Sequence, residues 1–315
     1  MPHVLIALMA LGAPAPSSIP GTGGFMSAVP AGDGFLCMTW AGQGLVLVSA
    51  DGAGRVLFEI RNSGYESISE PAFSSGRIAF AGRGPTTDEV VVMDTTGARL
   101  DSYGPYSSAG RPSWDSFGRL WYQADGCLMS EGGIVLEGIG DVAAVISPTG
   151  KRAAWPLESG LVVADVSGEG ADTLLSGFPV LLPVWIDGSR LLVPDLGGRI
   201  WLVQGAEASV VAEGESPAWD PASTGLFSAR TTDDGMSITS SRIVFSTLGG
   251  AAADVGAPPG TMPVRPEACG MGAAAVDASS GAVLLLPFDR EDAVLRKTRL
   301  RGPFPPGQDS SAAAD

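Results

Sequence analysis

Hydrophobic and polar residues alternate along this chain in short runs, and helical spacing is nearly absent. Runs such as "RIAFAG", "EVVVMD", "RLWYQA" and "SRLLVP" are rich in β-branched and aromatic residues, and glycine-containing turns separate them. Only "REDAVLRKTRL", near the end, fits a helix, and its position allows a strand equally well. The pattern therefore predicts an all-β protein.

The runs recur in groups that open on similar segments, for example "RPSWDSFGRLWY" and "SPAWDPASTGLFSA". The central residues of six such segments, which we call anchors, are Trp40, Phe73, Trp114, Ile146, Trp185 and Trp219. A seventh copy around Arg265 keeps the proline and loses the aromatic residue. Successive copies are 33, 41, 32, 39, 34 and 46 residues apart, a spacing that indicates a repeat architecture.

Each repeat contains an anchor segment and three further runs, which makes four strands. We therefore predict a β-propeller of seven four-stranded antiparallel blades. Proline suits the start of a blade because it lacks an N–H, and a large ring two residues later can fill the space between neighbouring blades. Six blades is the alternative, because the seventh copy is degenerate and "GGFMSAV" near the N-terminus then supplies a strand that closes the ring.

The repeat resembles that of TolB-type propellers, a branch of the WD-like propellers. The resemblance rests on Pro-x-Trp-[Ser/Asp]-x-x-Gly-[Arg/Lys] followed by a run ending in Asp-x-x-Gly, and it covers roughly residues 35–289. TolB carries a sizeable α/β domain ahead of its propeller, whereas only some 35 residues precede the first anchor segment here. The resemblance implies a fold rather than a partner.

Four segments follow from these patterns. Residues 1–15 contain a short apolar run followed by Ala13-Pro14-Ala15, which is typical of a signal peptide despite the lack of a basic start. Residues 16–34 form a Pro/Ser/Gly spacer with a possible ring-closing strand, 35–290 the propeller, and 291–315 a last strand with a disordered tail. We therefore expect a periplasmic or extracellular bacterial protein without an integral membrane segment; a buried N-terminal strand or helix is the alternative.

Charge narrows the choice of partners. The formal net charge of −15 repels phosphate backbones and anionic lipid headgroups, so nucleic acid is not an expected partner. One basic cluster, Arg296, Lys297, Arg299 and Arg301, fits a solvated last strand or tail. Another protein or a cell-envelope ligand is the expected partner.

Catalytic motifs are sparse. His3 is the only histidine and falls in the predicted signal peptide, which argues against Ser-His-Asp and Cys-His mechanisms. A Gly-x-Ser-x-Gly elbow is also missing. Carboxylate chemistry on a glycan needs only two acids, so a hydrolase or lyase stays open as the alternative to a non-catalytic scaffold. We expect a turn role for Asp115, Asp187 and Asp220.

Cysteine spacing and loop composition predict no metal site and no cofactor. Cys37, Cys127 and Cys269 stand far apart, which favours buried apolar roles over a zinc site, although one bridge plus one thiol stays open.

Binding residues are expected on three long polar loops, at residues 82–89, 103–111 and 230–241. The candidates are Arg83, Asp88, Tyr103, Tyr106, Arg230, Asp233 and Asp234. For the two tyrosines the alternative is packing on their own blade, and for the last loop it is a solvated insertion. The sequence thus predicts a non-catalytic protein-interaction or ligand-recognition scaffold.

Overall fold

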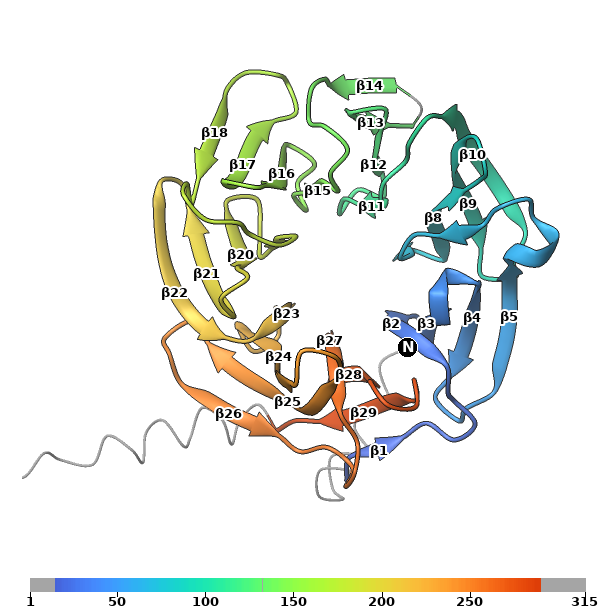
Figure 1. Ribbon diagram of the computed structural model, residues 1–315, viewed down its shortest axis with the longest axis vertical. Coiled ribbons are helices and arrows are strands. Elements are labelled where there is room, and N and C mark those ends of the chain that lie inside the picture. Colours follow the sequence, from blue (N-terminus) through green and yellow to red (C-terminus); the bar gives the residue numbers. More distant parts are fainter. Residues whose placement is uncertain (1–14, 132, 290–315) are drawn as a thin grey trace, which may run out of the picture.

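Seven antiparallel sheets surround a central axis in the computed structural model, which describes residues 15–131 and 133–289 (Figure 1). The two 3-10 turns η1 (Trp40–Gly42) and η2 (Ile60–Asn62) are the helical elements of this part of the chain. This confirms the predicted seven-bladed propeller. The predicted tail and basic cluster, and all of the predicted signal peptide except Ala15, lie outside the described residues.

The first three blades follow one another along the chain. Blade 1 contains β2 (Phe25–Ala31), β3 (Gly34–Thr39), β4 (Gly44–Ser49) and β5 (Gly54–Glu59). Blade 2 contains β6 (Ser67–Ile68), β7 (Ala72–Ser74), β8 (Arg77–Arg83), β9 (Asp88–Asp94) and β10 (Arg99–Tyr106). Blade 3 contains β11 (Ser113–Trp114), β12 (Leu120–Ala124), β13 (Cys127–Ser130) and β14 (Gly133–Leu136). In blade 2 the inner strand is split, because β6 and β7 both pair with β8.

Three blades of the same pattern come next. Blade 4 contains β15 (Val145–Ile146), β16 (Arg152–Leu157), β17 (Gly160–Asp165) and β18 (Ala171–Leu174). Blade 5 contains β19 (Val184–Trp185), β20 (Arg190–Pro194), β21 (Arg199–Gln204) and β22 (Glu207–Glu213). Blade 6 contains β23 (Glu215–Asp220), β24 (Gly225–Asp233), β25 (Ile238–Thr247) and β26 (Ala252–Val255). The first strand of each blade lies nearest the axis, as Figure 1 shows.

The two ends of the described chain complete blade 7. It contains β27 (Pro263–Cys269), β28 (Gly272–Asp277), β29 (Val283–Pro287) and, from the N-terminus, β1 (Ser17–Ser18) as its outermost strand. The ring therefore closes through β1 pairing with β29. "GGFMSAV" instead provides β2, so the boundary predicted at residue 35 falls inside blade 1.

The core lies between blades rather than within them. One cluster, for example, joins Leu36 and Leu45 of blade 1 to Ile78 and Phe80 of blade 2. Alternation along each strand explains this arrangement, because successive side chains point to opposite faces and both faces of a blade meet a neighbour.

Five of the six anchors pack against the preceding blade. Trp114 and Trp185 also donate their indole N–H to the inner strands of blades 2 and 4, at 3.3 Å to the Ala72 oxygen and 3.1 Å to the Val145 oxygen. Phe73, Ile146 and Trp219 belong to clusters shared with blades 1, 3 and 5. The repeated anchor therefore joins each of these blades to the one before it.

Trp40 does not have this role. It begins η1, after β3, and 65% of its surface is exposed. The prediction failed because "MTWAGQG" resembles the repeat in composition but follows the second strand of blade 1, and the inner strand β2 carries no Pro-x-aromatic segment.

Candidate functional site

A cavity of about 920 Å³ lies at the centre of the ring, lined by the inner-strand segments of blades 2 to 7. Two levels of side chains line it. The residues just before the repeat proline are Glu70, Arg111, Leu182, Ser216 and Arg265, and those just after it are Ala72, Ser113, Val184, Ala218 and Glu267. In blade 4, where Ala144 replaces the proline, Ala143 and Val145 hold these places. Strand alternation places both levels toward the axis and the anchors toward the neighbouring blade.

Three charged side chains meet at the first of these levels, which the residues just before the proline form. The Glu70 carboxylate accepts from Arg111 at 2.7 Å and from Arg265 at 3.2 Å, through different oxygens. Blade 7 supplies Arg265, blade 2 supplies Glu70 and blade 3 supplies Arg111, so this ionic bridge reaches past blade 1. The bridge connects parts of the ring that are 195 residues apart in sequence.

Irregular backbone positions two of these groups. Glu70 lies in the break between β6 and β7, and the register of β27 shifts between Val264 and Glu267. Arg265, at that shift, has a φ of 50°, in the left-handed region that non-glycine residues seldom adopt. Such bulges re-aim side chains, and backbone strain concentrates at functional sites.

Glu267 completes the channel cluster, a name we use for Glu70, Arg111, Arg265 and Glu267. Burial within the channel raises the pKa of Glu267 to about 7; the Arg111 guanidinium opposes this rise and the Glu70 carboxylate adds to it. Near neutral pH, the cluster therefore contains one carboxylate paired with two guanidiniums and one carboxyl group that exchanges its proton.

Replacing Glu267 with glutamine is expected to stabilise the protein at pH 8 and to leave its stability unchanged at pH 4. Between the ordinary pKa of 4.5 and the folded value of about 7, the native state binds a proton that the unfolded state has released, so stability falls as pH rises. Above pH 7 the full penalty is present, about 1–2 kcal/mol after solvent screening. Denaturant unfolding of Glu267→Gln and wild type at both pH values measures this penalty. If the two proteins differ in free energy of unfolding by the same amount at pH 4 and pH 8, Glu267 does not have the raised pKa.

The residues predicted on the first two loops lie outside the cavity lining. Asp88 accepts from the Ala109 N–H at 2.9 Å, while Arg83 is exposed at the end of β8. Tyr103 stacks on Tyr122 with ring centroids 5.7 Å apart, and the Tyr106 and Tyr122 hydroxyls are 2.9 Å apart. The tyrosines therefore pack between blades 2 and 3, and burial, with Asp101 as hydrogen-bond partner, raises the pKa of Tyr103 to about 12.

The third predicted loop is a hairpin that extends β24 and β25. Arg230 donates from Nε to the Glu213 carbonyl at 3.2 Å and lies 3.6 Å from its carboxylate. Asp233 and Asp234 accept backbone N–H groups of their own turn. The structure therefore does not bring the seven predicted residues together in one pocket, although strand direction places the hairpin at the end of the ring where the inner strands begin.

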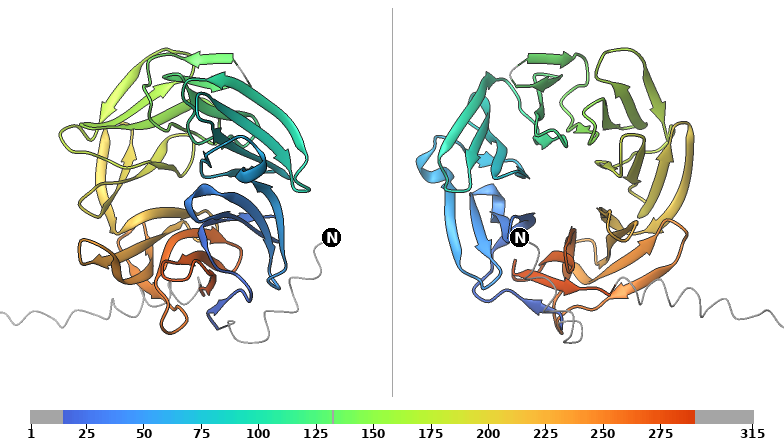
Figure 2. Two further views of the ribbon diagram at one scale, coloured as in Figure 1. Left: turned by 45° about the vertical axis from the view of Figure 1, so that its right-hand side comes forward. Right: turned by 180° about the vertical axis from the view of Figure 1, so that it is seen from behind.

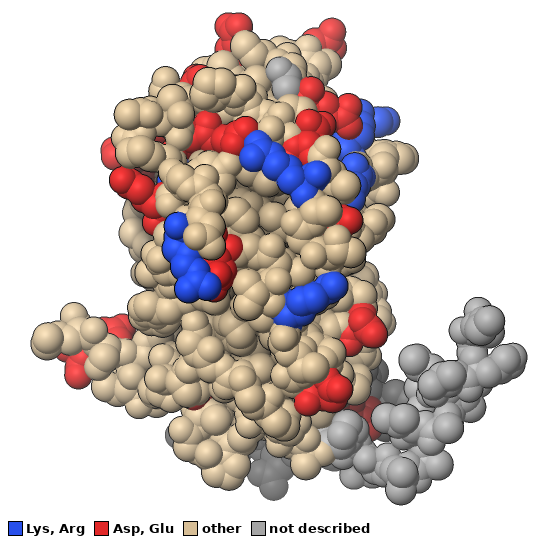
Figure 3. All heavy atoms as spheres, turned by 90° about the vertical axis from the view of Figure 1, so that its right-hand side faces the viewer, with Lys and Arg blue, Asp and Glu red and all other residues tan. Residues whose placement is uncertain are grey.

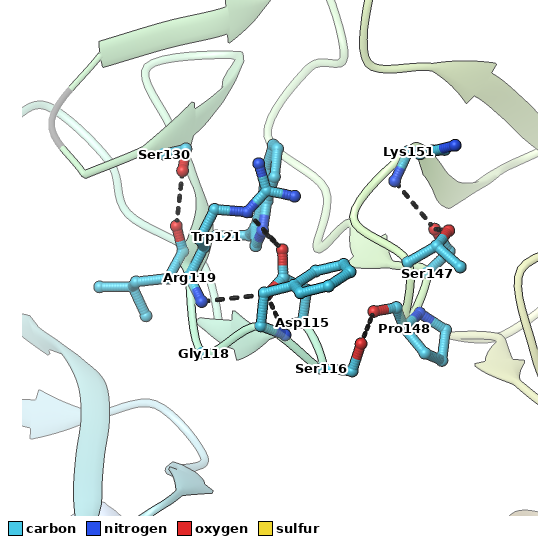
Figure 4. Close-up of polar contacts among 12 residues, drawn as sticks. Asp115, Ser116, Gly118, Arg119, Trp121, Ser130, Ser147, Pro148 and Lys151 are labelled. Atoms are coloured by element: carbon cyan, nitrogen blue, oxygen red, sulfur yellow. Dashed lines mark hydrogen bonds and ion pairs between the residues drawn. The ribbon is translucent and has the colours of Figure 1, made fainter.

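Asp115 and Asp187 serve turns. The Asp115 carboxylate is fully buried and accepts from the backbone N–H groups of Phe117 and Arg119, from Arg119 Nε at 2.7 Å and from Trp121 Nε1 at 3.1 Å (Figure 4). Burial alone would raise the pKa of Asp115, but hydrogen bonds from Arg119 and Trp121 hold it below its usual value. A carboxylate so fully engaged has no free lone pair to offer a substrate.

Sequence reasoning missed the channel cluster, although a signal was present. Glu70, Arg111 and Arg265 each directly precede the proline of a repeat. Aligning the repeats on that proline, rather than searching the longest loops, would have placed all three at one level of the axis.

Only one of the three cysteines is buried as expected. Cys37 is buried, and burial raises its pKa to about 12, whereas Cys127 and Cys269 are only half-buried. Among residues 15–131 and 133–289, no group of three or more potential ligands is arranged to hold a metal ion, and no helix has the length and apolarity needed to cross a bilayer.

Charges on the outside of the ring are dispersed. On the side drawn in Figure 3, most of the surface is uncharged, and several basic side chains lie directly beside acidic ones. Two ion pairs from the blades on this side are Arg61 with Glu59 at 2.7 Å and Arg99 with Glu89 at 2.5 Å. This side therefore carries no extended basic surface of the kind that binds nucleic acid.

The fold is shared with proteins of little sequence similarity. No protein-family model matches the chain, and no curated protein matches it by sequence. The WD40 propeller domain of Doa1 matches with a TM-score of 0.63 at 12% identity, over 87% of this chain and 98% of that domain. The propeller domain of Cps50 (Swd1) from Myceliophteria thermophila matches with a TM-score of 0.61 at 12% identity, over 85% of this chain and 98% of that domain.

Enzymes containing the same fold also match. A prolyl endopeptidase gives a TM-score of 0.57 at 16% identity, over 86% of this chain but only 51% of the endopeptidase. The chain thus spans about half the length of that enzyme. At these identities the matches establish the fold alone: the protein is a seven-bladed β-propeller similar in fold to WD40 domains.

Proposed function

We propose that the protein is an exported, TolB-like propeller that recognises a protein partner or a cell-envelope ligand at its central channel, without catalysis. The observation that carries the proposal is the cavity of about 920 Å³ with a charged cluster on one wall. Concave sites with a few convergent polar groups are typical of ligand binding. The repeat motif supports the TolB-like relationship, and the apolar segment before residue 15 supports export to the periplasm or the exterior.

Catalysis by histidine finds no support in the chain. The single histidine is His3, so the propeller itself contains no imidazole to act as a base or a metal ligand. Asp115, with its four hydrogen bonds, caps a turn.

Capture of cell-envelope components tests the proposal. The immobilised wild-type propeller is expected to retain a specific protein or glycan from a detergent extract of the host envelope. The double variant Glu70→Gln/Arg265→Gln is expected to lose at least about nine-tenths of it, since a few residues, often arginines, carry most of the binding energy of an interface. Arg61→Gln is the matched control, because Arg61 is also ion-paired but lies on the outside of blade 1. Equal capture by all three proteins would place binding elsewhere and contradict the channel assignment.

A carboxylate-dependent hydrolase or lyase acting on glycans is the second candidate. Glu70 and Glu267 line the same cavity, and their surroundings differ: Glu70 pairs with two guanidiniums, while burial raises the pKa of Glu267 to about 7. Glycoside hydrolysis uses two carboxyl groups beside one glycosidic bond, of which one acts as an acid with a raised pKa. Release of reducing ends from peptidoglycan, abolished by Glu267→Gln and by Glu70→Gln alike, would favour this candidate over the scaffold.

A further inference from the structure

The walls of the central channel differ in chemistry. Arg265, Glu70 and Arg111 come from blades 7, 2 and 3, on one side of the ring. On blades 4, 5 and 6, the residues just before and just after the repeat proline, or just before and after Ala144, which replaces it in blade 4, are apolar except for one serine. They are Ala143, Val145, Leu182, Val184, Ser216 and Ala218. Ring order puts these two walls opposite each other, so a ligand in the channel meets charge on one side and hydrocarbon on the other (Figures 1 and 2).

The charged wall favours a single negative charge. With Glu267 protonated, the channel cluster holds two guanidiniums and one carboxylate, a net charge of plus one, within a protein of net charge −15. A monoanion balances this charge, whereas a dianion such as a dicarboxylate exceeds it.

Donors remain for such an anion. A guanidinium has five N–H donors, and the contacts with Glu70 use the Nη1 atom of Arg111 and of Arg265. Both side chains line the cavity and are partly exposed, at 36% for Arg111 and 46% for Arg265. A planar carboxylate matches the fork of a guanidinium.

We propose that the channel binds a carboxylate with an apolar body, the carboxylate against Arg111 and Arg265 and the body against the wall formed by blades 4 to 6. This inference rests on the proposed function and names the ligand class of the same site. A peptide C-terminus with aliphatic last residues and a free aliphatic acid share this chemistry.

Binding is expected to be coupled to the proton on Glu267. Arg111 and Glu70 face Glu267 from blades 3 and 2, Arg265 precedes it by two residues on β27, and Asp115 lines the channel at the other end of β11. Ionised Glu267 repels a bound carboxylate, so the site is competent only in its protonated fraction. Since that fraction changes about tenfold between pH 6 and pH 8, so does the apparent affinity, which is higher at pH 6.

Calorimetric titration of the intact propeller tests this inference with two matched pairs of probes. These are N-acetyl-Ala-Val-Leu and its C-terminal amide, and hexanoate and hexanamide. At pH 6 the acids are expected to bind at least about tenfold more tightly than the amides, because the amides lack the charge that pairs with guanidinium. Binding of the peptide acid alone identifies a peptide C-terminus as the ligand, and binding of both acids identifies the free carboxylate as sufficient.

Three variants locate the binding. Arg265→Gln is expected to lower the affinity for the two acids at least about tenfold, and Arg61→Gln is expected to leave it unchanged. Glu267→Gln is expected to retain binding, but with the same affinity at pH 6 and pH 8. Circular dichroism of each variant checks that the ring is intact. Equal affinity of acids and amides, or no binding of either acid at pH 6, would overturn the inference. If envelope capture still depends on the channel in that case, the proposed function stands and only the ligand class is wrong.

Discussion

Replacing Ile19 with alanine is expected to destabilise the protein by about 2–4 kcal/mol, which is the usual cost of truncating a fully buried aliphatic side chain. Ile19 follows the two-residue strand β1, and only 2% of its surface is exposed. It belongs to a cluster that includes Phe35 of blade 1 and Val283 of blade 7. Its loss therefore leaves a cavity at the seam between the first and last blades, and urea denaturation of Ile19→Ala measures the cost.

Ser18→Ala is the matched control, because Ser18 is exposed in β1, next to Ile19, and its truncation removes no buried contact. The control is expected to change stability by less than about 0.5 kcal/mol. If the two variants unfold alike, the N-terminal segment does not hold the ring closed.

Replacing Asp115 with alanine is expected to cost about 2–4 kcal/mol, because four donors around a fully buried carboxylate lose their acceptor at once. These are the N–H groups of Phe117 and Arg119, Arg119 Nε and Trp121 Nε1. Asp115→Asn keeps one oxygen for the backbone donors, so it is expected to lose less stability than Asp115→Ala. Differential scanning calorimetry of both variants gives the comparison.

Asp187 provides the internal control. It holds the corresponding turn of blade 5 and also pairs with an arginine, Arg190, at 2.8 Å, but 40% of its side chain is exposed. Water replaces much of the hydrogen bonding and ion pairing that Asp187→Ala removes. The loss of stability is therefore expected to stay near or below about 1 kcal/mol. Equal losses at Asp115 and Asp187 would show that burial does not decide the strength of this turn.

Local patterns were enough to predict the blades. Strand alternation and turn glycines have a range of a few residues, so they are legible in sequence without knowledge of the neighbours. The same short range explains the error at Trp40. "MTWAGQG" has the composition of an anchor segment, but it follows the second strand of blade 1 instead of forming the inner strand.

Polar residues in loops proved a weak guide to the site. The sequence left Tyr103 and Tyr106 open between exposed recognition groups and packed rings, and the position of Tyr122 on the next blade decides between the two. Asp233 and Asp234 are similar, because their acceptor atoms are used by the N–H groups of the turn that they themselves shape.

The amino-acid sequence by itself determined the four-stranded unit, the place of six of its seven copies and the parity that turns anchors toward neighbouring blades. Tertiary structure alone decided where the ring closes and which charges share the axis. Glu70 and Arg265 are 195 residues apart and meet because seven blades complete one turn. The physical reason is one of range: alternation and turns depend on adjacent residues, whereas a contact across the channel depends on the summed geometry of every blade between its two ends.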